Sequence, residues 1–303
     1  MNPKNVVRML CACLLDVSAA HAATGLKVVA TLSTFGDLIK TIGGDAVTVT
    51  SIASPKFNPH FIEPRPSDVL NVKRANVFAH AGLDLEAWRD PLVNAAGNTG
   101  IRPGSAGDLD LSRGIPLLEV PSANVSRAEG DIHVFGNPHY WVSPENGRIM
   151  AQTIAAKLSE MDPANQAKYE QNLAEFLSRL DPKIAEWKEK AKPLAGMELV
   201  GYHKSWPYLM DFLGTKMEQF LEPKPGIPPS PQQVDFLKNY MKANAIKVIV
   251  TSSYFSDKAS QSLANDTGAK VLLLAQSVGE TKEATDYIAM IDYDVNALID
   301  ALN

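Results

Sequence analysis

Cysteine is nearly absent from this sequence of 303 residues, in which only Cys11 and Cys13 occur. Both precede residue 23 and would be lost with an N-terminal segment removed on export. A mature chain without cysteine can form neither a disulfide framework nor a thiolate metal site. Any metal would therefore have to be held by nitrogen and oxygen ligands.

The N-terminal segment has the pattern of a secretory signal. Lys4 and Arg8 precede an apolar run, and Ala20-His21-Ala22 supplies the small residues of a cleavage site. We therefore expect residues 1–22 to be a signal peptide. Lipid attachment at Cys13 is the alternative, although the apolar run before it is short.

Long hydrophobic runs and an excess of basic residues are also missing. No stretch after residue 22 approaches the roughly 18 uninterrupted apolar residues of a membrane span. The formal net charge is −5, which argues against a nucleic-acid partner. We expect a monomeric periplasmic, or otherwise extracytoplasmic, protein that is long enough for two domains.

What the sequence does contain is α/β alternation. Short β-branched runs separated by helical segments are typical of parallel sheets built from βαβ units. The expected strands are 26–33, 47–54, 77–83, 197–203, 246–253 and 270–277. The fold class is thus α/β, with two (βα)-type lobes whose sheets are rich in parallel strands.

A long helical segment separates the two groups of strands. Its apolar residues recur at helical spacing from Tyr169 to Trp187, and Pro182 predicts a kink or a restart within it. We expect an N-terminal lobe at 23–160, a long rigid linking helix at 161–194 and a C-terminal lobe at 195–303.

Histidine is scarce, with six residues in the whole chain. His80 lies in an apolar strand and is interpreted as a core or sheet-edge residue. His60, His139 and His203 instead follow predicted strands or sit in loops with proline, where ligands of parallel sheets bind.

The tripeptide Asn-Pro-His occurs twice, in FNPHFIEPRPSD and in GNPHYWVSPEN. Proline would present the following histidine from a stiff loop, and the rings of Phe61 and Tyr140 would shield a site there. Two imidazoles from one lobe and one from the other would close a metal site across a cleft. The alternative is that Asn-Pro merely marks two ordinary turns.

These two motifs, together with GYHKSWPYLMDFLG and the ending YIAMIDYDVNALIDAL, resemble the cluster A-I substrate-binding proteins of bacterial zinc and manganese ABC transporters. The resemblance extends over essentially the whole mature chain. It implies two lobes joined by one long helix, a single divalent metal carried in the cleft, and delivery to an ABC permease of the inner membrane. It also implies that the protein is not an enzyme.

Carried over residue by residue, the resemblance places metal ligands at His60, His139 and His203. A histidine at the third position is common in zinc-type members and a glutamate in manganese-type members, so Zn²⁺ is the expected cargo and Mn²⁺ or iron the alternative. Neutral imidazoles also suit Zn²⁺ better than Mn²⁺. Surface attachment to host molecules, known in some members, could accompany metal binding.

The fourth ligand position departs from the family pattern. Relatives often have an aspartate where this chain has Gln276, so the ligand could be Gln276, the nearby Glu280 or water. Relatives often have a glutamate near Ser252, and we expect Ser252 to support the site instead. Glu63, three residues after His60, could orient its imidazole, or could stabilise the loop before the next helix.

His133 lies where many zinc-type relatives have a long histidine-rich loop, but this chain has a single histidine there. A metal role for His133 is therefore left open. A secreted zinc hydrolase would also use three histidines, but the sequence contains neither His-Glu-x-x-His nor Gly-x-Ser-x-Gly. We therefore expect no catalytic residues.

Overall fold

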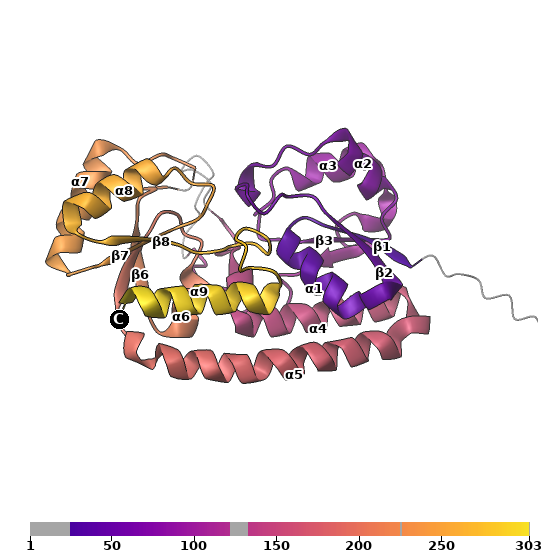
Figure 1. The fold of residues 1–303 in the computed structure, drawn as a ribbon. Coiled ribbons are helices and arrows are strands. Elements are labelled where there is room, and N and C mark those ends of the chain that lie inside the picture. Colours follow the sequence, from indigo (N-terminus) through magenta and orange to yellow (C-terminus); the bar gives the residue numbers. More distant parts are fainter. Residues whose placement is uncertain (1–24, 122–132, 225, 303) are drawn as a thin grey trace, which may run out of the picture.

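The computed structural model describes residues 25–121, 133–224 and 226–302. They form two α/β lobes that lie side by side above the long helices of the chain (Figure 1). The strands are β1 (Leu26–Ala30), β2 (Val47–Ser51), β3 (Val77–His80), β4 (Asp108–Asp110), β5 (Glu198–Gly201), β6 (Lys216–Phe220), β7 (Val248–Thr251) and β8 (Lys270–Leu273). The helices are α1 (Ser33–Gly43), α2 (Pro66–Lys73), α3 (Arg89–Ala96), α4 (Pro144–Met161), α5 (Gln166–Ala191), α6 (Pro207–Leu213), α7 (Pro231–Ala243), α8 (Asp257–Thr267) and α9 (Tyr287–Leu302).

Each lobe contains a parallel sheet with the same strand order. The first sheet runs β2-β1-β3-β4 and the second β6-β5-β7-β8. Among the central strands, β3 and β7 are buried at every position, as expected for strands covered on both faces. Because parallel strands end at one edge, the loops that follow them gather at one edge of each lobe.

The predicted α/β fold with two lobes and parallel sheets is confirmed. The six expected strands are present, although each ends earlier than predicted. Sequence reasoning missed β4 and β6, the edge strands DLD and KMEQF, because their polar residues carry no buried-strand pattern. The expected signal segment lies outside the described residues. Along the part of the chain described here, no helix combines the length and apolarity needed to cross a bilayer.

Helix α5 passes beneath both lobes (Figure 1) and contacts helices of each. It is 26 residues long and continues through Pro182, so the predicted restart there was wrong. Leu180 and Ile184 on either side of the proline are buried, and their packing holds the helix together where one backbone donor is missing.

Polar contacts fix α5 to both lobes. Near its start, Asn172 donates a hydrogen bond of 2.8 Å to the carbonyl of Ile42 in α1. Near its end, Lys183 and the indole of Trp187 contact the same Asp292 oxygen in α9, at 3.0 and 2.9 Å. The lobes therefore share one continuous helical support.

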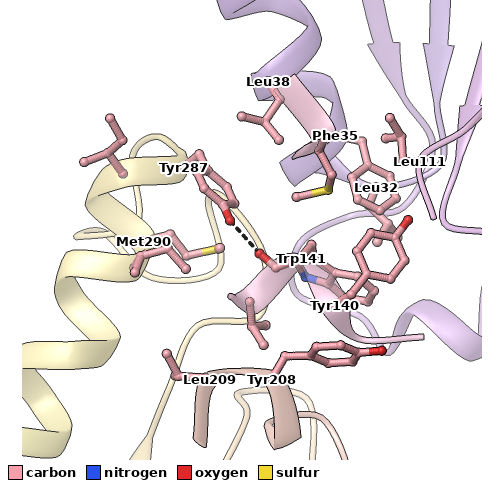
Figure 2. Close-up of a cluster of buried hydrophobic side chains, with 14 of the residues drawn as sticks. Leu32, Phe35, Leu38, Leu111, Tyr140, Trp141, Tyr208, Leu209, Tyr287 and Met290 are labelled. Carbon is pink, nitrogen blue, oxygen red and sulfur yellow. Dashed lines mark hydrogen bonds between the residues drawn. The ribbon is translucent and has the colours of Figure 1, made fainter. Parts of the chain in front are cut away.

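A buried cluster rich in aromatic side chains joins the two lobes (Figure 2). The hydroxyl of Tyr287, from α9, lies 2.9 Å from the carbonyl oxygens of both Trp141 and Ser143. The indole Nε1 of Trp141 donates a hydrogen bond of 2.7 Å to the carbonyl of Gln276. The segment after the second Asn-Pro-His is thus anchored to the C-terminal lobe.

Replacing Gly147 by alanine should destabilise the protein. A Cβ at this position in α4 would lie 2.4 Å from the Tyr287 ring, which is itself fully packed. Overpacking of this kind costs about 1–3 kcal/mol, which exceeds the roughly 1 kcal/mol that alanine contributes through helix propensity. Urea unfolding of the metal-free protein measures the difference, with Gln152→Ala on the exposed side of α4 as a control. A midpoint for Gly147→Ala equal to or above that of the wild type would contradict this packing.

Candidate metal centre

The first Asn-Pro-His forms a tight turn that presents His60. Pro59–Phe61 is a single 3₁₀ turn, and the side-chain oxygen of Asn58 accepts a hydrogen bond of 3.0 Å from the His60 backbone N–H. The indole of Trp88 donates to the Pro59 carbonyl at 2.9 Å. His60 is therefore held by a capped turn that is anchored to its own lobe.

In the second Asn-Pro-His, the asparagine also orients the ring. Asn137 Oδ1 accepts from the His139 backbone N–H at 2.9 Å and lies 3.0 Å from His139 Nδ1. The amide nitrogen of Asn137 donates to Glu119 and to the carbonyl of Lys204, both at 2.9 Å. Because Lys204 follows His203, this asparagine connects the histidine loops of the two lobes.

His203 follows β5 and is paired with a carboxylate. Its Nδ1 lies 2.6 Å from Oε2 of Glu222, a residue just after β6. With Nδ1 donating to the carboxylate, the lone pair of His203 is on Nε2. This Nε2 is buried and has no hydrogen-bond partner among the described residues. Sequence reasoning missed Glu222 because it missed β6, the strand that places it.

The three predicted histidines converge. His60 Nε2 and His139 Nε2 are 3.0 Å apart, and the centroid of the His203 ring lies 5.4 and 5.2 Å from theirs. Two nitrogens bound to one tetrahedral zinc are separated by about 3.4 Å, given Zn–N distances of about 2.0–2.1 Å. The rings of Trp141 and Phe255 pack against His139 and His203. The arrangement fits a single shared ion.

Burial keeps two of these imidazoles neutral. It lowers the pKa of His60 and of His139 well below the usual histidine value, and the neighbouring histidines lower both further. For His60 a hydrogen bond with the Leu85 backbone opposes this shift. A metal-binding histidine must be unprotonated, so the site is prepared for a cation near neutral pH.

His133 joins this cluster, which the sequence left open. The ligand nitrogens of His60, His133 and His139 all lie within 4.8 Å of one another. The centroid of the His133 ring is 5.1 Å from that of His60 and 5.9 Å from that of His139. The sequence signals were a histidine six residues before His139 and its place where similar proteins have a histidine-rich loop.

Gln276 and Glu280 lie in the loop after β8, but both are engaged by protein groups. The hydroxyl of Tyr254 donates to Gln276 Oε1, and the backbone N–H of Gln276 donates to Glu280 Oε2 at 2.8 Å. Glu280 Oε1 accepts from the backbone and the hydroxyl of Ser253, at 2.9 and 2.8 Å. Ser252 is buried next to this network.

The other residues predicted to surround the site differ in how deeply they are buried. Tyr140 is fully buried and donates a hydrogen bond of 2.8 Å to the Ala81 carbonyl, so its hydroxyl holds the loop after β3. Glu63 is exposed and lines a surface groove of about 350 Å³ with Phe61, which is 59% exposed. His80 is buried and paired with Asp108 at 2.9 Å.

Two lobes with buried imidazoles between them define a binding protein for a metal ion. The sequence profile of the family named zinc-uptake complex component A, periplasmic, matches residues 28–301, and the chain belongs to this family. Its members are substrate-binding proteins of metal ABC transporters and not enzymes, as the sequence predicted.

Individual relatives agree over nearly the whole chain. The manganese ABC transporter substrate-binding lipoprotein of Streptococcus mitis is 28% identical, with 98% of this chain and 95% of that protein covered. The high-affinity zinc uptake system protein of Bacillus subtilis is also 28% identical, and the match covers 94% of this chain and 90% of that protein. A crystal structure of ZnuA superposes with a TM-score of 0.77 at 25% identity, and the match covers 92% of this chain and 100% of that chain.

The metal-free protein should lose stability as the pH falls from about 7.5 to about 5.5. In the unfolded chain His60 and His139 regain an ordinary pKa near 6.5 and become protonated, whereas in the folded protein their lowered pKa keeps them neutral. The unfolded state then binds more protons, so stability rises with pH, by up to about 1.4 kcal/mol per pH unit for each histidine. Urea unfolding at several pH values gives the free energy of unfolding as a function of pH. This free energy should rise less steeply with pH in the double variant His60→Gln/His139→Gln than in the wild type. Parallel profiles would contradict this assignment.

Changing Glu222 to glutamine should weaken metal binding without abolishing it. The amide would replace a charged acceptor at His203 Nδ1, which leaves the imidazole less basic and less firmly oriented. We expect Zn²⁺ affinity to fall about 10–100-fold. Competition titration with a chelator measures the change, with Glu218→Gln, at an exposed position of the preceding strand β6, as the control. Wild-type affinity in Glu222→Gln would show that the carboxylate does not act on the metal ligand.

Proposed function

We propose that this protein captures Zn²⁺ in the cleft between its lobes and delivers it to an ABC permease of the inner membrane. His60, His139 and His203 are the metal ligands in this proposal. The protein acts in the periplasm as a monomer, after removal of residues 1–22. The observation that carries the proposal is the convergence of three buried imidazole rings, with the Nε2 atoms of His60 and His139 only 3.0 Å apart.

The ligand chemistry of this chain supports zinc over manganese. The relatives' names include both metals, so kinship alone does not decide between them. Imidazole nitrogen suits Zn²⁺, whereas Mn²⁺ prefers carboxylate and water oxygens. Nearby carboxylates have other partners, since Glu222 pairs with His203 Nδ1 and Glu280 with Ser253. Manganese or iron remains the alternative cargo.

The helical support favours delivery through small movements. The proposed linking segment at 161–194 contains α5, which contacts α1 and α4 on one side and α6 and α9 on the other. A wide hinge rotation between lobes 23–160 and 195–303 would have to break these contacts. Metal loading is therefore expected to shift loops or tilt the lobes slightly. The permease would recognise the altered surface around the cleft.

Zinc titration of the metal-stripped protein tests this function. The wild type should bind one Zn²⁺, and His60→Ala, His139→Ala and His203→Ala should each lose at least about 100-fold in affinity, because each removes a direct ligand. His80→Gln, which alters a buried histidine outside the cluster, should keep one-to-one binding. Elemental analysis of protein from its native compartment identifies the cargo. No stoichiometric metal, or binding unaffected by the three alanine variants, would refute the proposal.

A further inference from the structure

Three histidines leave a four-coordinate ion one ligand short. Zinc in proteins is almost always tetrahedral, with the fourth position filled by a side chain or by water. The C-terminal lobe offers Gln276 and Glu280 for this position. Their hydrogen bonds decide whether either is free to bind.

Both candidates are occupied by protein donors. Gln276 Oε1, the amide atom able to bind a cation, accepts the hydroxyl of Tyr254, whereas Gln276 Nε2 is buried with no hydrogen-bond partner among the described residues. The backbone of Gln276 is held by Trp141 and Glu280. Both oxygens of Glu280 accept hydrogen bonds, Oε1 from Ser253 and Oε2 from Gln276. Moving Glu280 to the ion would leave the buried backbone N–H of Gln276 without its acceptor, which costs about 1–3 kcal/mol. Moving Gln276 would break the hydrogen bond from the partly buried Tyr254 hydroxyl.

His133 is already at the cluster. Its ligand nitrogen lies within 4.8 Å of those of His60 and His139, and its ring stacks on His60 at 5.1 Å. A short turn joins it to the second Asn-Pro-His, with the N–H of Gly136 donating to the His133 carbonyl at 3.4 Å. Gly136 has φ of 115°, which only glycine adopts readily. The turn therefore places His133 and His139 on the same side of one loop.

We propose that His133 is the fourth metal ligand, giving an all-imidazole site in which Gln276 does not bind the ion. This inference rests on the proposed function and specifies the ligand set of the same site. Three ligands then come from the N-terminal lobe and only His203 from the C-terminal lobe. Without a carboxylate in contact with the ion, the site discriminates against Mn²⁺ and other hard cations.

Paired variants test the assignment. Zn²⁺ affinity and the visible absorption of the Co²⁺ form are measured for the wild type, His133→Ala and Gln276→Ala. His133→Ala should lose roughly tenfold or more in Zn²⁺ affinity, and its Co²⁺ absorption bands should shift, because water would replace an imidazole in the fourth position. Gln276→Ala should match the wild type in both. X-ray absorption of the zinc form should show the outer-shell scattering of four imidazole rings in the wild type and of three in His133→Ala.

Replacing His133 by a carboxylate provides a second test, in which metal preference should change. His133→Asp should raise Mn²⁺ affinity relative to Zn²⁺, because it adds a hard oxygen ligand to the site. Thermal unfolding of the metal-free variants checks that each is folded. If the wild type binds Zn²⁺ but Gln276→Ala is the variant that loses it, or if His133→Ala and His133→Asp behave as the wild type, the assignment to His133 is overturned. Absence of stoichiometric Zn²⁺ binding in the wild type would instead overturn the proposed function itself.

Discussion

The structure depends on one constraint: its clustered imidazoles must stay buried and neutral, with their nitrogens directed at one point. A protonated imidazole would be repelled by its neighbours as well as by a cation, so burial of His60 and His139 and the pairing of ring nitrogens with Asn137 and Glu222 serve the same end. Each Nδ1 that donates outward leaves an Nε2 lone pair facing inward. The geometry of the imidazole cluster is therefore built by acceptors placed behind the rings.

The twin sheets explain how two lobes can share this centre. Because both have the same strand order, the loop after β2, which carries His60, and the loop after β5, which carries His203, can meet between the lobes. Contacts below the site then fix the separation: Trp141 bonds to the Gln276 carbonyl, and Tyr287 bonds back to Trp141 (Figure 2). The scaffold is stiff where it sets the distances between the histidines, and the histidines themselves come from loops.

Sequence reasoning recovered the lobes, the parallel strands and the convergence of three histidines, because burial patterns and Asn-Pro turns are local signals. It did not find Glu222, since β6 is a polar edge strand. The residue that pairs with a histidine ring nitrogen also has no characteristic spacing in the sequence. It could not weigh Gln276 against His133, because that choice depends on which side chains the fold has already paired. The hydroxyl of Tyr254 on Gln276 is a tertiary contact that no spacing predicts.

An asymmetric ligand set would reconcile tight capture with release. If His60, His133 and His139 stay with the N-terminal lobe, a small displacement of the other lobe withdraws only His203, and the ion passes from four protein ligands to three. Such a step needs no rotation of α5, whose contacts with α1 and α9 can persist throughout. A permease that pulled on the loop after β5 would thus open one coordination position while the rest of the site stayed intact. Neutral ligands favour this route, because no protein carboxylate is left to hold the departing dication.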